Sequence, residues 1–381
     1  MVEWKKLGEI TRRNKGIPIT AGQMSELASK DGNVRVFAAG STIADIDESR
    51  LPKKCAHKLP SIIVKSRGYI DFEFYEKPFT HKNEMWSYSF DNKQEGKFIY
   101  YFLTTQTDFF RNIAKANSVK LPQLCVADTD NFSIPIPSLE EQARIVGILD
   151  TFTSAIDNLK EQIAQRRKQY EYYRDQLLDL EGKEIITTLS FGDDFQLKAR
   201  IGWQGLTKKE YKTSGDYKLV TGTDFTGNLR IDFESCVFVE KERYEQDEYI
   251  KLKVGDVLIT KDGTLGKVAY IDKLDMPATL NGGIFVVRDP KKRVIPKFIM
   301  YYLTSYHFKK WMQQNHTTGS IQHLTQKLLS TFTIPVLSEI EQQRIVSILD
   351  TFESSIQNLE AQLKQREKQY EYYRNKLLSF E

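Results

Sequence analysis

Loops that combine cationic, hydroxyl and amide side chains with glycine are the parts of this 381-residue sequence best suited to binding chemistry. Three of them, at residues 66–68, 261–264 and 281–283, adjoin segments rich in β-branched residues. Lysine and arginine in such loops can bind phosphate, whereas amide and guanidinium groups can hydrogen-bond to base edges. The pattern suits contact with nucleic acid, although an ordinary hairpin turn also explains each loop taken alone.

Motifs that support catalysis are missing from the sequence. The glycine run at residues 263–267 is too short for a P-loop and lacks its Ser or Thr. Neither GxGxxG nor GxSxG occurs, and the motifs of a methyltransferase are absent as well. Asp194, Glu210 and Lys212 can be aligned with a nuclease pattern, but they lie in polar loops rather than on a strand. The sequence therefore predicts a non-catalytic chain.

Cysteine and histidine are too scattered for a metal site. The three cysteines lie far apart, and none of the five histidines makes an HExxH motif. No apolar run reaches 18 residues, and the first residues lack the hydrophobic segment of a signal peptide. These features predict a reduced, cytoplasmic protein with no bound metal and no contact with a membrane.

The elements that carry these loops belong to a tandem repeat with a period of 200 residues. Residues 133–180 and 333–380 align without a gap and are identical at 29 of 48 positions. The similarity continues weakly upstream, between residues 96–105 and 296–305, and then fades. The chain is thus a duplication of one unit, in which a variable globular part precedes a nearly constant helical part.

Formal charge follows the same division. The chain has 55 Lys+Arg and 51 Asp+Glu, a net charge of +4, which excludes a polybasic protein and an acidic-tail protein. The net charge is +4 for residues 1–137, −2 for 138–180, +4 for 181–337 and −2 for 338–381. Two mildly basic bodies are therefore predicted to alternate with two mildly acidic helices.

Each constant segment predicts one long helix of a coiled coil. Ser138 and Ser338 are each followed three residues later by Glu, the pattern of a capping box. Apolar side chains then recur with 4-3-4-3 spacing over five heptads, interrupted only by Arg166 and Arg366. The predicted seam comprises Ile145, Leu149, Phe152, Ile156, Leu159, Ile163, Tyr170, Tyr173 and Leu177, and Ile345, Leu349, Phe352, Ile356, Leu359, Leu363, Tyr370, Tyr373 and Leu377.

Two arrangements satisfy this periodicity, because each helix could pack on its own globular part or pair with the other helix. Two matching seams separated by a long insert favour pairing, with antiparallel helices and a pseudo-twofold arrangement. At 1.5 Å per residue, such a rod would be about 60 Å long. The tyrosines of the KQYEYYR repeats exceed what a two-helix seam needs, so we expect a further partner on the outer face of the coil.

The globular parts are expected to be mixed α/β. Each contains one helical stretch late in its sequence, at about residues 97–115 and 297–315. The predicted strands are residues 61–66, 218–222, 236–240, 256–261, 267–272 and 283–289.

In this organisation the sequence resembles the specificity subunit of type I restriction–modification enzymes. The helix starts IPIPSLEEQARIVGILD and IPVLSEIEQQRIVSILD are similar to the conserved regions of that family. The openings EWKKLGEI and KARIGWQGLTKKEY are similar to the starts of its recognition domains. The runs KVGDVLITKDGTLGKVAYI and PSIIVKSRGYIDFEFYEKPFTHKNEMWSY are similar to signatures within those domains. The resemblance covers essentially the whole chain and is most specific in the helices.

The resemblance implies an α+β fold. Two globular mixed α/β target recognition domains would be separated by two long antiparallel coiled-coil helices related by a pseudo-twofold. We predict target recognition domain 1 at residues 1–137, spacer helix 1 at 138–180, target recognition domain 2 at 181–337 and spacer helix 2 at 338–381.

The resemblance also implies a function. Each recognition domain would read one half of a bipartite, asymmetric target in double-stranded DNA, and the coiled coil would set the unread gap. Two modification subunits would bind S-adenosylmethionine and methylate adenine. Restriction subunits, which use ATP and Mg, would add translocase and nuclease activity. This chain would bind no cofactor itself.

Matching the family's loop motifs nominates residues for DNA contact, among which lysines suit phosphate better than bases. The nominated residues of the first domain are Lys65, Ser66, Arg67, Thr80, His81, Lys82, Asn83, Ser118 and Lys120. Those of the second domain are Thr221, Gly222, Thr223, Asp224, Lys261, Asp262, Thr264, Lys267, Asn281, Thr318, Ser320, Gln322 and His323.

Two other functions stay open at this stage. The chain could be a coiled-coil scaffold whose globular domains bind protein, and it would then bind no duplex even at low salt. A self-sufficient nuclease would cleave DNA with Mg²⁺, and Glu210→Ala would abolish that cleavage.

Overall fold

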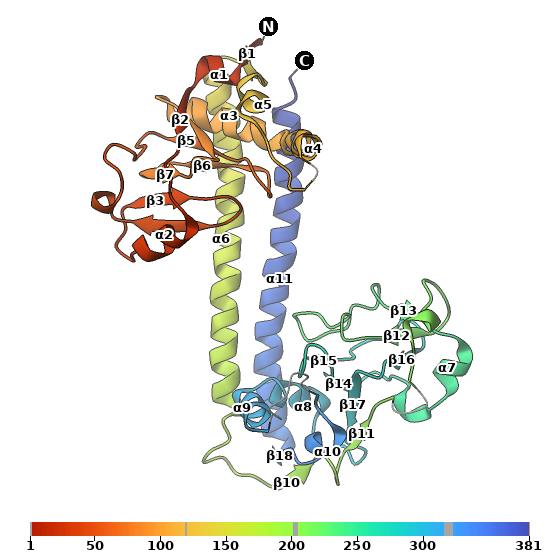
Figure 1. Cartoon of the computed structure of the whole chain (residues 1–381). Coiled ribbons are helices and arrows are strands. Elements are labelled where there is room, and N and C mark those ends of the chain that lie inside the picture. Colours follow the sequence, from red (N-terminus) through yellow and green to blue (C-terminus); the bar gives the residue numbers. More distant parts are fainter. Residues whose placement is uncertain (1, 119, 201–204, 316–322, 381) are drawn as a thin grey trace. The chain divides into compact units, whose positions relative to one another are not determined.

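The computed structural model describes residues 2–118, 120–200, 205–315 and 323–380. It divides into two units: unit 1 contains residues 1–159 and 362–381, and unit 2 contains residues 160–361. Each unit joins a globular domain to one half of helix α6 (Leu139–Leu178) and one half of helix α11 (Glu339–Leu377), which Figure 1 draws in yellow-green and blue.

Unit 1 has a strand pair and two sheets. The pair joins β1 and β9, the four-stranded sheet has the order β2-β8-β5-β6, and the three-stranded sheet has the order β4-β3-β7. All neighbours are antiparallel except β3 and β7. The strands are β1 (Glu3–Lys6), β2 (Arg12–Lys15), β3 (Val34–Phe37), β4 (Ile43–Ile46), β5 (Ser61–Lys65), β6 (Asp71–Tyr75), β7 (Phe79–His81), β8 (Trp86–Ser89) and β9 (Ser133–Ile136).

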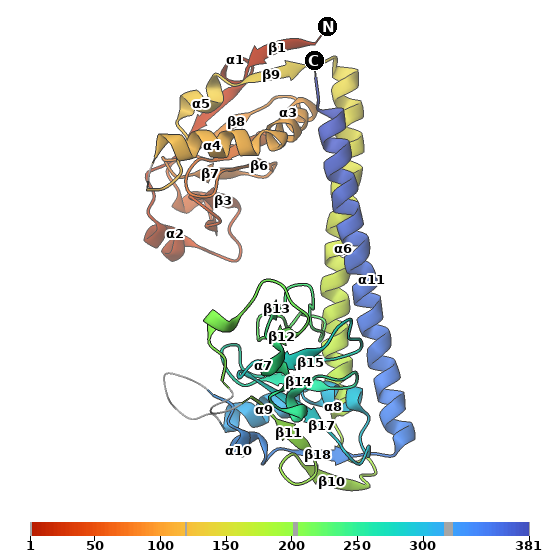
Figure 2. The same cartoon turned by 90° about the vertical axis from the view of Figure 1, so that its right-hand side faces the viewer.

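The helices of unit 1 cover the four-stranded sheet. Figure 2 shows α3 and α4 beside this sheet, and the core between them includes Ile145, Val146 and Leu149 of α6 and Leu378. A second, smaller core lies around β3, β4 and α2. The short elements are α1 (Leu7–Ile10), α2 (Ala21–Leu27), η1 (Glu48–Arg50), α3 (Lys93–Thr105), α4 (Thr107–Asn117) and α5 (Val126–Asp130).

Unit 2 repeats this topology strand for strand. Its pair is β10-β18, its four-stranded sheet is β11-β17-β14-β15, and its three-stranded sheet is β13-β12-β16, again with one parallel pair, β12 and β16. The duplication therefore includes the globular domains, where sequence similarity fades. The strands are β10 (Thr187–Ser190), β11 (Gln196–Lys198), β12 (Lys218–Val220), β13 (Val237–Phe238), β14 (Val257–Thr260), β15 (Val268–Tyr270), β16 (Ala278–Leu280), β17 (Ile284–Arg288) and β18 (Thr333–Val336).

Two cores hold unit 2 together. One face of the four-stranded sheet packs with the helices, α6 and α11, and the other packs against the three-stranded sheet. The helical elements are η3 (Lys208–Glu210), α7 (Lys241–Glu245), η4 (Glu248–Ile250), α8 (Pro296–Tyr302), α9 (Tyr306–Gln314) and α10 (Gln326–Leu329).

The helix halves pair with each other inside each unit, as the heptad pattern predicts. In unit 1 the ring of Phe152 stacks on that of Tyr373 with centroids 5.4 Å apart, and in unit 2 Tyr173 stacks on Phe352 at 5.4 Å. An ion pair in unit 2 joins Arg167 to Glu360 at 2.5 Å. Between Arg167 and Tyr173 the partner number falls by eight, so the two halves run antiparallel.

The two arginines that interrupt the heptads have a role in this pairing. The guanidinium of Arg166 lies 5.9 Å from the ring centre of Phe352, and that of Arg366 lies 5.7 Å from the ring centre of Phe152. An arginine over an aromatic face is attracted by the negative charge of that face. The break in the apolar pattern is therefore a cation–π contact, repeated once in each unit.

Two local predictions hold only in part. The helical stretches at 97–115 and 297–315 are each divided into two helices, at Gln106 in unit 1 and at residues 303–305 in unit 2. Hydroxyl groups near each division bond to carbonyls three residues earlier, which competes with the regular helical pattern. The Oγ atoms of Thr104 and Thr304 donate to residues 101 and 301 at 2.7 and 2.8 Å. The capping boxes are half formed: Ser138 and Ser338 cap the helices, but the glutamates three residues later pair with Arg144 and Arg344.

Candidate nucleic-acid interface

The nominated loops of unit 2 lie together at one end of its sheets. The N–H of Asn281 donates to the carbonyl of Val220 at 2.9 Å, which joins the ends of β16 and β12. The N–H of Lys261, after β14, donates to Gly283 at 2.8 Å, and the N–H of Leu324 donates to Lys261 at 3.0 Å. Residues 221–224, 261–267, 281–283 and 323 therefore form one loop cluster, although up to 102 positions separate them in the sequence.

Asp224 organises the first of these loops from within. Its carboxylate is buried and accepts from the N–H of Thr221 at 2.7 Å, from the hydroxyl of Thr221 at 3.0 Å and from that of Ser235 at 3.2 Å. The carboxylate thus fixes the turn, while Thr223 is exposed and Gly222 is half-buried. Of this group, Thr223 is the side chain most accessible to a ligand.

The loop after β14 is closed by Thr260. The hydroxyl of this buried residue accepts from the N–H of Lys267 at 2.9 Å and donates to the carbonyl of Thr264. Gly263 and Gly266 have positive φ angles of 71° and 76°, which side chains other than glycine rarely adopt. The loop therefore holds Thr264 exposed and Lys267 half-buried.

Four further nominated residues of unit 2 already have partners. His323 Nδ1 lies 2.5 Å from Asp262 Oδ1, and both side chains remain about half exposed. The ammonium of Lys261 lies 5.3 Å from the ring centre of Phe285. The side-chain carbonyl of Asn281 accepts from the N–H of Gly283 at 2.9 Å. The nominated Thr318, Ser320 and Gln322 lie outside the described residues.

Unit 1 forms a comparable cluster from different residues. The N–H of Gly68 donates to Pro122 at 2.8 Å, and the hydroxyl of Ser66 donates to the carbonyl of Glu84 at 2.7 Å, so the loops after β5, after β7 and before α5 meet. Ser66 is buried, whereas Arg67, Asn83 and Lys120 are exposed. Ser118 is half-buried and its hydroxyl accepts from the N–H of Leu121 at 3.4 Å. Lys65 and Lys82 form ion pairs with Glu73 and Glu84, both at 2.8 Å.

Thr80 and His81 lie beneath this cluster rather than on it. Both are fully buried on β7. The imidazole of His81 contacts the hydroxyl of Ser87 and the carbonyl of Lys82, each at 3.2 Å. Burial lowers the pKa of His81 to about 4, so this side chain is neutral at pH 7 and offers no charge to phosphate. The two side chains support the loops that surround them.

The residues of the nuclease pattern do not converge. Asp194 accepts from Arg293 at 2.8 Å, Glu210 pairs with Arg243 at 2.8 Å, and Lys212 pairs with Glu240. Each belongs to a different local ion pair, and the described part of the chain has no group of three side chains placed to hold a metal ion. This geometry gives no support to Asp194, Glu210 and Lys212 as a catalytic set.

Sequence reasoning missed a cluster that ties each domain to its helices. Asp150 of α6 accepts from Lys97 Nζ at 2.6 Å and from Tyr101 Oη at 2.7 Å. Asp350 of α11 accepts from Lys297 and Tyr301 at the same two distances. The same three residue types recur at the 200-residue offset, so the cluster could have been found by comparing the two copies of the repeat.

The predicted seam residues range from buried to exposed. The deeply buried ones, each at most 9% exposed, are Ile145, Leu149, Ile156, Ile163, Ile345, Leu349 and Ile356. The half-buried ones are Phe152, Leu159, Tyr170, Leu177, Phe352, Leu359, Leu363, Tyr370 and Leu377. Tyr173 and Tyr373 are 47% and 41% exposed although their rings stack across the pair, and the neighbouring Tyr172 and Tyr372 are 62% and 59% exposed.

Comparison with known protein families gives a match over most of the chain. A family described as the type I restriction modification DNA specificity domain matches residues 1–166 and 203–367, one region in each half of the sequence. The chain is 30% identical, over 100% of its length and 94% of the relative's, to the EcoR124I/EcoR124II type I restriction enzyme specificity subunit of Escherichia coli. It is 27% identical, over 100% of its length and 96% of the relative's, to a putative type I restriction enzyme specificity subunit of Haemophilus influenzae.

Solved structures share the fold. The crystal structure of a type I restriction–modification system S subunit from M. genitalium superposes with a TM-score of 0.63 and 17% identity, covering 100% of this chain and 97% of that one. A structure described for complex assembly and conformational transition of the type I R-M system gives a TM-score of 0.55, 17% identity and coverage of 99% and 96%. None of the described helices carries a segment long and apolar enough to span a bilayer.

Proposed function

Because the chain belongs to the family of type I restriction–modification DNA specificity subunits, we propose that it selects the DNA target of such an enzyme. The observation that carries this proposal is the repetition of one arrangement in both units. In each, polar loops meet at one end of the same two sheets, and an aspartate ties that domain to the long helices. A chain with two such clusters can contact two separate stretches of one duplex.

The target of this chain is bipartite and asymmetric. The two clusters have different residues, since Arg67, Asn83 and Lys120 are exposed in unit 1 and Thr223 and Thr264 in unit 2. Different side chains at equivalent places select different base pairs, because sequence is read by hydrogen bonds to base edges in the grooves. Each recognition domain therefore reads its own half-site, and the paired helices set the unread gap between them.

Catalysis belongs to partner subunits in this proposal. Two modification subunits supply S-adenosylmethionine and adenine methylation, and restriction subunits supply the ATP- and Mg-dependent steps in the cytoplasm. The exposed Tyr172 and Tyr372, each beside a stacked tyrosine, give the helix pair an aromatic outer surface suited to a protein partner. The chain itself binds no cofactor and acts by placing the modification subunits on DNA.

A domain exchange tests this function. The chain is purified with its cognate modification subunit, and the methylated motif is determined by sequencing. Replacing residues 1–137 by a recognition domain of a relative should change one half of the motif and leave the other half and the gap unaltered. The matched exchange of residues 181–337 should change only the opposite half. An unaltered motif after either exchange, or a change in both halves, would contradict one domain per half-site.

Salt dependence separates this function from a protein-binding scaffold. Binding of the complex to its target should weaken steeply as salt rises, by about 10³-fold or more between 50 and 200 mM if six or more phosphates are contacted. A scaffold would bind no duplex at 50 mM salt with the modification subunit present. Magnesium-dependent cleavage by the chain alone, lost in Glu210→Ala, would instead support a nuclease.

A further inference from the structure

A loop of unit 2 connects its two cores. Residues 221–236 join β12 to β13, and Phe225 and Ile231 in this loop pack in the core between the two sheets. Leu229, at the tip, packs instead against the core that contains α6 and α11. We call residues 226–230 the strut, and the three-stranded sheet β13-β12-β16 with its core the distal lobe. The strut links the distal lobe to the long helices.

The tip of the strut has a constrained backbone. Leu229 has a positive φ of 58°, and its carbonyl accepts from the N–H of Tyr270 at 2.9 Å. The N–H and hydroxyl of Thr226 donate to the carbonyl of Arg230 at 2.9 and 2.7 Å. A left-handed conformation at a leucine is unfavourable and persists only where neighbouring contacts hold it. The tip is thus fixed on both sides.

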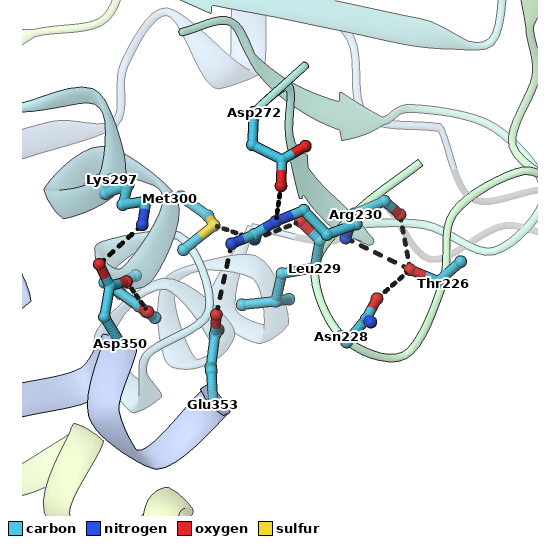
Figure 3. A network of polar contacts seen from close by, with 10 residues as sticks. Thr226, Asn228, Leu229, Arg230, Asp272, Lys297, Met300, Asp350 and Glu353 are labelled. Atoms are coloured by element: carbon cyan, nitrogen blue, oxygen red, sulfur yellow. Dashed lines mark hydrogen bonds and ion pairs between the residues drawn. The ribbon is translucent and has the colours of Figure 1, made fainter. Parts of the chain in front are cut away.

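Arg230 joins three parts of unit 2 through one guanidinium. Its Nε atom donates to Asp272 Oδ2 at 3.0 Å, Nη2 lies 3.7 Å from Glu353 Oε2, and Nη1 lies 3.8 Å from the sulfur of Met300. Figure 3 shows this side chain extending from the strut toward Glu353 of α11, with Met300 of α8 beside it. Arg230 therefore binds the strut to α8 and to α11, and its side chain is only 18% exposed.

Burying the carboxyl group of Glu353 at this position costs free energy. Its side chain is 9% exposed, and its Oε1 atom has no hydrogen-bond partner among the described residues. The carboxylate faces a cavity of about 200 Å³, which Asn228, Leu229 and Tyr170 also line. A buried ionisable side chain of this kind adds little to stability compared with a well-packed apolar side chain, but it restricts the arrangement of its partner. Its presence favours a role in orientation.

Unit 1 has no such link among its described residues. The equivalent connection, between β3 and β4, is only residues 38–42, and the position equivalent to Glu353 is Thr153. Apolar side chains between residues 17 and 58 pack in separate small cores, and none belongs to the core that contains α6 and α11. The strut is thus a feature of the second domain alone.

We propose that Arg230 and Glu353 are positioning residues for the reading of the second half-site. Through the strut they hold the distal lobe at one angle to the helices, so that the loop at 221–224 and the loop at 281–283 meet their base pairs together. This inference rests on the proposed function, because it requires that unit 2 reads a half-site. Neither residue needs to touch DNA.

Discrimination against single base-pair changes tests the proposal. The complex with the modification subunit is prepared as wild type, Arg230→Met, Glu353→Gln and the double variant, and methylation rates are measured on the native target and on targets altered in either half. A single mismatch typically costs about 10- to 100-fold. We expect this penalty to fall to about threefold in the second half-site and to stay unaltered in the first. Arg230→Lys should restore part of it.

The matched control is Arg35→Met. Arg35 also forms an ion pair, with Asp45 at 2.8 Å, but within the three-stranded sheet of unit 1 and away from the helices. This variant should leave discrimination in the second half-site unchanged. Equal loss at both half-sites in Arg230→Met, or no loss at either, would overturn the positioning role.

Hydrogen exchange separates this proposal from the proposed function. The amide of Tyr270, which donates to Leu229, should exchange at least tenfold faster in Arg230→Met and Glu353→Gln than in wild type, in the chain without DNA. Unchanged exchange would refute the strut even if the wild-type complex methylates a bipartite target. A wild-type complex that methylates no such target, with the amide protected as expected, would refute the function and leave the strut intact.

Discussion

The two units share the parts that face the long helices and differ in the parts farthest from them. Asp150 with Lys97 in unit 1 and Asp350 with Lys297 in unit 2 have the same contacts at the same distances. In contrast, the three-stranded sheet of unit 1 packs in two small cores, whereas that of unit 2 packs in a single core with a strut. Residues on the helices must pack both against each other and against their own domain. Residues of the three-stranded sheets lack this constraint and can differ between the two units.

Truncating one seam leucine in each unit should produce the largest loss of stability. The two variants test whether the helix pair contributes equally to the stability of both units. Leu149 and Leu349 are fully buried, so Leu149→Ala and Leu349→Ala should each lower the free energy of unfolding by about 2–5 kcal/mol. Urea denaturation followed by circular dichroism measures the loss. A loss in one unit more than twice that in the other would break the equivalence of the two seams.

The buried carboxyl of Glu353 should make the stability of unit 2 depend on pH in a way that unit 1 does not share. Burial raises the pKa of Glu353 to about 7, against about 4.5 when the chain is unfolded. Because the folded state holds this proton more tightly, its contribution to stability is complete below about pH 4.5 and is lost as the pH rises through 7. The expected loss is about 3 kcal/mol.

Thermal unfolding from pH 5 to pH 8 measures this effect. Arg230, Asp350, Lys297 and Tyr301 also act on the carboxyl, so the comparison is made with Glu353→Gln, which keeps those groups. In this variant the melting temperature should fall much less between pH 5 and pH 8 than it does in wild type. Thr153→Ser in unit 1 should leave the decline as in wild type, and a Gln variant that declines as steeply as wild type would contradict the assignment to Glu353.

Neutralising the aspartate that ties each domain to the helices should cost less. Asp150→Asn and Asp350→Asn keep the shape but remove the charge that Lys97 and Lys297 neutralise. Because the carboxylates are about one-third exposed, solvent screens the pair, and we expect a loss of about 1–2 kcal/mol in each variant. Equal losses, measured by urea denaturation, would confirm that this contact is equivalent in the two units.

The cation–π contacts at the heptad breaks should give the smallest effect. Arg166→Ala and Arg366→Ala each remove one guanidinium from an aromatic ring and should destabilise by about 0.5–1 kcal/mol. Replacing the same residues by leucine restores an apolar seam and serves as the comparison. Leucine variants less stable than the alanine variants would show that these positions do not face the helix pair.

The helices were predictable from the sequence because their signal is local and doubled. A heptad pattern depends on neighbouring turns, so Ile145 and Leu349 can be identified as buried without knowledge of the rest of the chain. The helix breaks at Gln106 and at residues 303–305 were not predictable from periodicity, since hydroxyl bonds to the backbone, such as those of Thr104 and Thr304, leave the apolar pattern unchanged.

The candidate interface was only partly predictable. Loops at strand ends could be found from composition, and the structure does bring Lys261 and Asn281 together. Whether a polar side chain points out or in depends on contacts made far along the chain. Asp224 faces Ser235, and His81 faces Ser87, so both are buried. The Arg230–Glu353 contact spans 123 positions and has no counterpart in the repeat, so no sequence pattern predicts it.

The division of α6 and α11 between the units has a consequence for synthesis on the ribosome. The core of unit 1 is made from residues of the first 149 positions and from Leu378, with Tyr370 and Leu377 packed against it. The domain of unit 1 is therefore translated first but lacks part of its core until residues 370–378 have been translated. Unit 2 is continuous in sequence and can complete its core earlier. A chain truncated before residue 370 and released from the ribosome should thus hold a finished second domain and an unfinished first one.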